Sequence, residues 1–167
     1  MITKSSEIKG SRKIALLDVE NLAGSPHLTP HQAVQVQLKL QRVYPLDPQD
    51  IVYVGGSTAN AIACGIVATM AHGSLCLRRG RDGAEIALCE QASQIPQGAY
   101  KSHLYPIVEC VIGSGDHYFV TFARQMKSRG LPVTVVSRRG SLSAGLAVIA
   151  DRVIYLDNSG SELRKAA

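Results

Sequence analysis

Blocks of apolar and polar residues alternate along this chain with the lengths of strands and helices. Short, nearly continuous apolar runs predict strands, because a strand that is covered on both faces carries no polar alternation. These runs are residues 14–17, 51–56, 74–78, 106–113, 132–137 and 152–156. Longer segments with apolar residues at helical spacing predict helices between them. These segments are residues 29–43, 58–73, 83–95, 118–130 and 141–150.

Strands therefore alternate with helices throughout, which indicates an α/β fold. We expect a doubly wound, mainly parallel sheet of five to six strands with helices on both faces. Residues 13–157 form the predicted domain, whereas the basic N-terminus (1–12) and the tail (158–167) are predicted to be flexible. In such a sheet, ligands bind beyond the carboxyl ends of the strands, at the point where the strand order reverses. Polar residues directly after strands are therefore the first candidates for a site.

Polar side chains follow two of the predicted strands at the point where each strand ends. Asp18 and Asn21 come after the first strand, and Ser114 and Asp116 follow the strand 106–113 on a Gly-Ser-Gly turn. Several carboxylates at one sheet edge repel one another and raise their own pKa values unless a cation joins them. Oxygen ligands suit Mg²⁺ or Mn²⁺. The sequence therefore predicts a divalent-metal site at this edge.

Each aspartate, taken singly, also fits a structural role. Asp116 is well placed to N-cap a helix from His117 to Arg129, and Asp18 could cap a loop. For either residue alone the cap is the better interpretation. The combination of D-x-x-N after one strand and S-G-D after another favours a functional site.

Composition and charge narrow the function classes only slightly. The chain has 167 residues, of which 46% are apolar and 19% charged, as in one ordinary globular domain with a real core. A net charge of +5 suits a polyanionic partner, although many basic proteins bind nothing acidic. Aromatic residues make up 5% of the chain, with no Trp. Their scarcity argues against the aromatic platforms that bind single strands without catalysis.

The cysteines and the N-terminus point to the cytoplasm. Cys64, Cys76, Cys89 and Cys110 form no C-x-x-C pair and are spaced unlike a zinc site. Small buried hydrophobic residues in a reducing compartment are the simpler interpretation. The N-terminal stretch MITKSSEIKGSRK lacks the apolar core of a signal peptide, and no apolar run approaches the length of a membrane span.

Four segments resemble the NYN domains, a branch of the PIN-like ribonucleases. They are LLDVENL, GAEIAL, VIGSGDHYFVTFARQMKSRGLPVTVVS and SLSAGLAVIADRVIYLD. The resemblance covers residues 13–157 and implies a Rossmann-like, PIN-type fold. It also implies an RNA endonuclease that hydrolyses phosphodiester bonds with Mg²⁺ or Mn²⁺ held by acidic side chains.

The resemblance assigns roles to individual positions. Asp18 is similar to the family's first metal ligand, Glu85 to its acid at a helix start, and Asp116 to the acid of the S-G-D turn. These three are therefore the expected catalytic and metal-binding residues. Asn21 corresponds to the asparagine that orients the first loop or contacts substrate, and Ser114 to the serine partner of the turn.

The chain departs from the family pattern after the S-G-D turn. Family members often carry another acid two or four residues later, where this chain has Tyr118 and Val120. Asp82 could compensate, because it lies one helical turn before Glu85 and could share its face. Glu20 is a weaker substitute, because on an extended segment it alternates away from the first ligand. The departure leaves open a catalytically weak or inactive RNA-binding or assembly module on the same fold.

Two arginine clusters at the expected site edge are candidates for contacts with RNA phosphates. They are Arg78, Arg79 and Arg81, and Arg138 and Arg139. Solvated loops are the alternative interpretation. The sequence leaves open a homo-oligomer and a protein partner that supplies specificity.

A nucleotide-binding oxidoreductase is the competing interpretation of the stretch YVGGSTAN, which follows a strand and opens a helix. The stretch lacks both G-x-G-x-x-G and G-x-x-x-x-G-K-[ST]. The first turn, where a dinucleotide fingerprint belongs, holds D-V-E-N instead. An acidic turn there repels pyrophosphate, which disfavours this interpretation.

Overall fold

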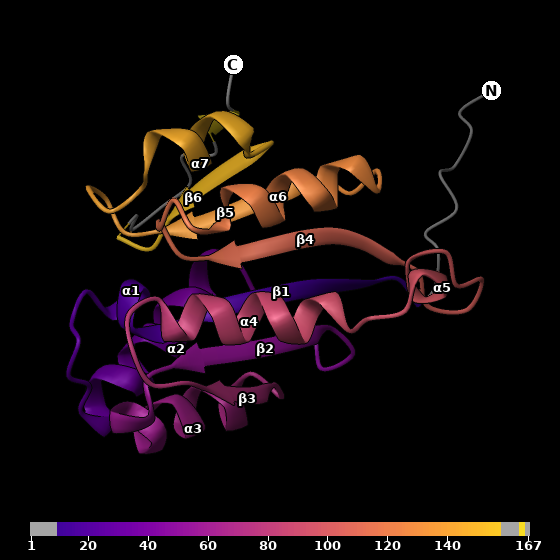
Figure 1. Cartoon of the computed structure of the whole chain (residues 1–167). Helices are drawn as coiled ribbons and strands as arrows, with labels where there is room; N and C mark the ends of the chain where they lie inside the picture. The colour runs from indigo at the N-terminus through magenta and orange to yellow at the C-terminus, as the bar shows by residue number, and fades with distance from the viewer. Residues whose placement is uncertain (1–9, 158–163, 166–167) are drawn as a thin grey trace.

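The computed structural model describes residues 10–157 and 164–165 (Figure 1). These residues form a seven-stranded sheet in the order β3-β2-β1-β4-β5-β6-β7. The strands are β1 (Arg12–Asp18), β2 (Ile51–Gly56), β3 (Ser74–Leu77), β4 (Ile107–Gly113), β5 (Val133–Ser137), β6 (Arg152–Tyr155) and β7 (Arg164–Lys165). The first six strands are parallel to their neighbours, and β7 pairs antiparallel with β6. The predicted doubly wound α/β fold is confirmed.

Helices cover both faces of this sheet. They are α1 (Val19–Ala23), α2 (Pro30–Val43), α3 (Ala61–Met70), α4 (Gly83–Ser93), α5 (Gln97–Tyr100), α6 (Phe119–Ser128) and α7 (Ala144–Ile149), with a short 3₁₀ helix at Thr58–Asn60. Each of the five predicted helices is present. The sequence pattern missed α1 and α5, because four or five residues are too few to display a helical period. The 3₁₀ turn forms the first part of the predicted helix 58–73.

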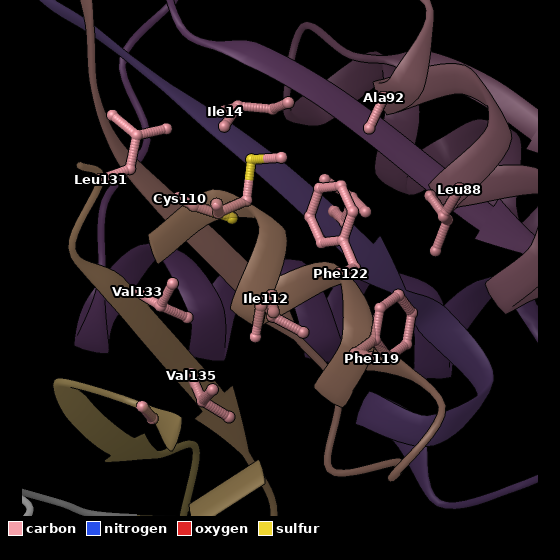
Figure 2. Packing of buried hydrophobic residues seen from close by; sticks show 14 of the residues in the cluster. Ile14, Leu88, Ala92, Cys110, Ile112, Phe119, Phe122, Leu131, Val133 and Val135 are labelled. Atoms are coloured by element: carbon pink, nitrogen blue, oxygen red, sulfur yellow. The ribbon is translucent and has the colours of Figure 1, made fainter. Parts of the chain in front are cut away.

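The central strand β1 feeds two separate cores. Ile14 and Leu16 pack into the cluster beneath α4, α6 and α7, whereas Ala15 and Leu17 pack into the cluster beneath α1, α2 and α3. This division follows from the period of two along a strand. Figure 2 shows the first cluster, with Phe119 of α6 beside Ile112 of β4. Burial on both faces explains why the strands read as continuous apolar runs.

The strand order also locates the crevice of the sheet. The order 3-2-1-4-5-6 reverses between β1 and β4, so the crevice opens at the carboxyl ends of these two strands. In Figure 1, α4 lies along β1 and β2, while α6 lies along β4 and β5. Asp18 ends β1, and Gly113 ends β4. The topology thus brings the two predicted acidic turns to one edge.

The domain ends differ slightly from the predicted boundaries. Strand β1 begins at Arg12, inside the predicted basic N-terminus, and β7 lies inside the predicted tail. A two-residue strand carries no sequence pattern of its own, so β7 could not be predicted. The other residues of these two ends, 1–9, 158–163 and 166–167, lie outside the described residues. Every helix within residues 10–157 is too short or too polar to cross a membrane.

We expect the replacement Leu16→Ala to destabilise the fold by about 2 to 5 kcal/mol, because it opens a cavity in the central strand. Leu16 is fully buried. The matched control is Leu38→Ala on α2, whose side chain is 52% exposed and whose loss should cost less than about 0.5 kcal/mol. Urea denaturation of both variants measures the difference. Equal losses would contradict the two-core architecture.

Candidate functional site

Asp18 lies at the junction between β1 and α1 and is 2% exposed. Its Oδ1 accepts a hydrogen bond from the backbone N–H of Asn21 at 3.2 Å, which makes it the N-cap of α1. Its Oδ2 accepts a hydrogen bond from the Ser114 hydroxyl at 3.2 Å. The predicted capping role is therefore present, but the cap serves a helix rather than a loop. The same carboxylate also borders the site.

The turn after β4 is locked to the turn after β1. Ser114 is fully buried, and its Oγ accepts a hydrogen bond from the N–H of Asp116 at 3.2 Å while donating to Asp18. The N–H of Gly115 donates to Oδ1 of Asn21 at 2.9 Å. Both supporting residues predicted from the sequence, Asn21 and Ser114, thus hold the acidic turns together.

The loop that follows β5 packs closely against Gly115. The carbonyl oxygen of Gly115 accepts a hydrogen bond from the N–H of Ser143 at 2.8 Å. A Cβ atom at this position would overlap the carbonyl group of Ser141. The small residues of the Gly-Ser-Gly turn therefore serve a close approach of backbones at the mouth of the site.

Asp116 does not N-cap α6, and that prediction is wrong. The helix begins at Phe119, and the residue at its cap position is Tyr118, which makes no side-chain cap. Asp116 instead closes its own turn, because its Oδ1 accepts the N–H of Tyr118 at 2.8 Å. The same oxygen lies 3.2 Å from Nδ1 of His117, an exposed side chain. The carboxylate of Asp116 therefore stays at the rim of the site.

A pocket of about 180 Å³ opens at the carboxyl end of β1. Four carboxylate side chains line it, those of Asp18, Glu20, Asp82 and Glu85. The structure therefore brings the predicted residues Asp18, Asp82 and Glu85 together. Asp116 lies outside this pocket, but its charge acts on Glu85.

Glu20 is a site residue that the sequence reasoning placed wrongly. Residues two apart on an extended segment share a face, so the expected turn of Glu20 away from Asp18 is wrong. Residues 19–23 form the helix α1, and Glu20 lines the pocket together with Asp18. Its Oε1 accepts hydrogen bonds from the N–H of Ser57 and the side-chain amide of Asn60, both at 2.7 Å. The D-x-x-N spacing was the available signal, because an N-cap and its N3 residue stand three positions apart.

The pKa of Asp18 is raised to about 7. Burial is the largest cause, the neighbouring charge of Glu85 is the second, and the charge of Glu20 adds a smaller effect. Hydrogen bonds from Asn21 and Ser114 stabilise the charged carboxylate and lower the pKa in part. A carboxyl group with such a pKa in a polar crevice is a recognised mark of a functional site.

The pKa of Glu85 is also raised above its ordinary value. Burial is the largest cause, and the charges of Asp116, Asp82 and Glu20 add to it. The first helical turn of α4 holds Glu85 in this position. Asp82, directly before the helix, has a left-handed backbone with φ of 53°, a conformation that aspartate tolerates better than most residues. The carboxylates of this edge therefore repel one another in the free protein.

The donor chemistry of the pocket fits a hard divalent cation. Its charged groups are all carboxylates, and a cation would relieve their repulsion. Within the described ranges, however, no three His, Cys, Asp or Glu side chains are placed to hold one ion. Mg²⁺ is usually bound through one or two carboxylates with several waters. The predicted ligands Asp18, Glu85 and Asp116 are therefore not brought together as a three-residue set, and Asp18 and Glu85, whose charges act on each other, are the two of them that line the pocket.

Arg138 connects the loop after β5 to the turn after β1. Its Nε donates to the carbonyl oxygen of Asn21 at 2.9 Å. Its guanidinium fills the space where a Cβ of Gly24 would lie, and Gly24 ends α1 with φ of 72°. Arg139 lies with its guanidinium 4.8 Å from the ring centre of Tyr155. The structure thus gives Arg138 a positioning role that its sequence context did not reveal.

The first arginine cluster surrounds the pocket more loosely. Arg78 donates to both carboxylate oxygens of Glu90 at 3.0 Å. Arg79 donates to the hydroxyl of Thr58 at 3.3 Å. Arg81 is 96% exposed, and its Nε lies 4.0 Å from the carboxylate of Asp82. Arg79 and Arg81 are therefore the cations best placed to meet a ligand at the rim.

Comparison with known proteins establishes the fold and no activity. No family model matches this chain, and no curated protein matches it. A crystal structure of a protein of unknown function from Vibrio parahaemolyticus is similar, with a TM-score of 0.57 and 17% sequence identity. The similarity covers 90% of this chain and 96% of that chain. The resemblance to NYN domains therefore stays a prediction.

The stability of the metal-free protein should fall as the pH rises from about 4 to about 7. The unfolded chain releases the proton of Asp18 near pH 3.8, whereas the folded chain keeps it until about pH 7, so raising the pH favours unfolding in that window. At about 1.4 kcal/mol for each pKa unit, the loss approaches about 4 kcal/mol.

The variant Asp18→Asn should lose this dependence and be more stable than the natural protein at pH 8. Urea denaturation in chelator at pH 5 and pH 8 measures the effect. Asp47→Asn, in the loop before β2, is the control and should keep the natural pH profile. A less stable Asp18→Asn at pH 8 would show that the carboxylate is held without electrostatic cost.

Proposed function

We propose that this protein is a metal-dependent RNA endonuclease of the NYN type, which hydrolyses phosphodiester bonds at the crevice between β1 and β4. The observation that carries the proposal is the pocket of four carboxylates at the carboxyl ends of β1 and β2, next to the point where the strand order reverses. Buried acids that repel one another need a compensating cation. Oxygen ligands of this kind suit Mg²⁺ or Mn²⁺.

Asp18 and Glu85 would hold the metal. When bound there, Mg²⁺ or Mn²⁺ supplies a Lewis acid for the phosphoryl oxygen and lowers the pKa of a water nucleophile. Asn21 and Ser114 keep the Asp18 carboxylate in one orientation through their hydrogen bonds. Asp116 adds negative charge at the mouth of the pocket, where it can orient water at the metal.

RNA is the substrate that the charge and the resemblance favour. The chain carries a net charge of +5, and Arg79 and Arg81 stand at the rim of the acidic pocket. Cations around an acidic centre bind the phosphates that flank the scissile bond. The four cysteines are free, which supports a reducing, cytoplasmic location.

A catalytically weak or inactive RNA-binding module is the second candidate. It is favoured by Tyr118, which stands where the resembled family often has an acid. The Tyr118 side chain borders a groove between α4 and α6 rather than the acidic pocket. A site with fewer ligands would bind RNA and cut it slowly or not at all.

We expect the natural protein to cleave a mixed single-stranded RNA in Mn²⁺ or Mg²⁺ and not in chelator. Asp18→Asn and Glu85→Gln should each slow cleavage by at least about 100-fold, because loss of a ligand costs at least as much as loss of its supporting residues. Asp47→Asn is the matched control. A gel time course measures cleavage, and a thermal shift with metal measures binding independently.

The outcome separates the two candidates. Metal-dependent cleavage that requires Asp18 supports the enzyme. RNA binding without cleavage by the natural protein would overturn the enzyme and leave the module. A metal-induced thermal shift that survives Asp18→Asn would contradict the ligand assignment.

RNA affinity should also fall with added salt, and the double variant Arg79→Ala/Arg81→Ala should flatten this dependence. Each lost phosphate contact should reduce the log–log slope by about 0.7 for single-stranded RNA. Affinity should drop about equally for all sequences. The control is Arg42→Ala, in the last turn of α2. Titrations by fluorescence anisotropy at several salt concentrations provide the slopes. An unchanged slope would show that these arginines lie in solvated loops and do not contact RNA phosphates.

A further inference from the structure

A groove of about 590 Å³ separates α4 from α6 on one face of the sheet. One stripe of each helix lines it, at the spacing of residues that share a helical face. On α4 the groove begins at Ile86, directly after Glu85 of the acidic site, and it runs to Ser93. On the other side it begins at His117, directly after Asp116. The groove and the acidic pocket share no lining residue, but the charges of Asp82 and Glu85 act on Tyr118 of the groove, so the groove lies beside the candidate active site.

The lining of the groove has the chemistry of a site for a flat, polar-edged ring. Ile86 and the buried Phe122 give it apolar surface. Ser93, Thr121 and Gln125 add neutral hydrogen-bonding groups along its length. Neutral donors and acceptors beside apolar surface suit the edge and the face of a nucleobase, whereas phosphate requires cations.

The anionic residue of the groove is already neutralised. Glu90 accepts two hydrogen bonds of 3.0 Å from the guanidinium of Arg78. This pair removes the repulsion that an unpaired carboxylate would exert on a nucleic acid. It also places Arg78 over the rim, where the sugar–phosphate chain of a bound nucleotide would pass.

Tyr118 stands where the groove meets the acidic site. Its side chain is 36% exposed. Its ring makes an edge-to-face contact with Phe119, with centroids 6.4 Å apart and planes at 80°, and its N–H is held by Asp116 at 2.8 Å. Two fixed neighbours therefore hold an exposed aromatic ring beside the proposed position of the scissile phosphate. Aromatic rings of this kind stack nucleobases.

We propose that the α4–α6 groove binds one nucleobase of single-stranded RNA, stacked on Tyr118, next to the phosphate at the acidic pocket. This inference rests on the proposed RNA substrate. It gives Tyr118 a binding role in place of the acid that the resembled family often carries there. A single base site is also consistent with the scarcity of aromatic residues in the chain, because it needs one ring rather than a platform.

Binding of a labelled single-stranded RNA, measured by fluorescence anisotropy in chelator, tests the stack without any cleavage. Tyr118→Ala should weaken binding about 5- to 100-fold, whereas Tyr118→Phe should stay within about 2-fold of the natural protein. The matched control is Tyr105→Ala, because Tyr105 is 53% exposed and lies at the opposite edge of the sheet, before β4. Circular dichroism melting checks that each variant is folded.

A second arm replaces the nucleotides of the RNA, one at a time, by abasic ones. One position should weaken binding by the natural protein as much as Tyr118→Ala does, and the same replacement should have no further effect on Tyr118→Ala. This non-additivity is the signature of a direct contact. Fully additive losses, or an unchanged affinity of Tyr118→Ala, would overturn the base site. Displacement of bound RNA from the groove by an amphipathic helical peptide, with no abasic effect, would also overturn it and identify a protein-docking groove.

The same measurements separate this inference from the proposed function. If cleavage requires Asp18 but RNA binding and cleavage are unchanged in Tyr118→Ala, the base site is contradicted and the nuclease is supported. If RNA binding requires Tyr118 and responds to the abasic replacement, but no metal-dependent cleavage occurs, the base site is supported and the nuclease is contradicted. If the natural protein binds no RNA, both proposals are contradicted.

Discussion

The hydrogen bond from the buried Ser114 hydroxyl to the Asp18 carboxylate joins the two strands at which the sheet reverses its order. Around this bond, the turn after β1 donates to Asp18 through the N–H of Asn21, and the turn after β4 donates to the Asn21 side chain through Gly115. Arg138 adds a third loop by donating to the Asn21 carbonyl oxygen. The walls of the crevice are therefore joined by hydrogen bonds among short polar side chains, backbone groups and one arginine side chain.

Placing the Asp18 carboxylate in this buried, acidic crevice disfavours its charged form. Burial and the charge of Glu85 raise the pKa of Asp18 to about 7, so the charged site destabilises the metal-free fold at neutral pH. A divalent cation would remove this cost and stabilise the folded state by linkage. Under the proposed function, the carboxylates that bind the metal would therefore be the ones that destabilise the free protein.

Helix α4 lines both the acidic pocket and the groove. Helix α4 presents Glu85 to the pocket and Ile86 to the groove. The segment before α6 contributes Tyr118 to the groove, and Asp116, outside the pocket, acts on Glu85 through its charge. A single-stranded substrate could therefore place a phosphate and an adjacent base at once. Under the two proposals, such two-point binding would fix the position of the scissile phosphate relative to the acidic residues.

The sequence by itself determined the order of strands and helices, and with it the meeting of Asp18, Ser114 and Asp116 at one edge, because apolar periodicity and parallel topology are local and general constraints. It did not determine the inward placement of Glu20, since the one-turn helix α1 has no readable period. It offered a helix cap as the structural alternative for Asp116, and the structure shows no such cap, because the side chain of Asp116 closes its own turn instead. Only the tertiary structure decided that Arg138 braces Asn21, 117 positions away in the chain, and that a groove separates α4 from α6. Contacts between distant loops depend on packing geometry, which no short stretch of sequence encodes.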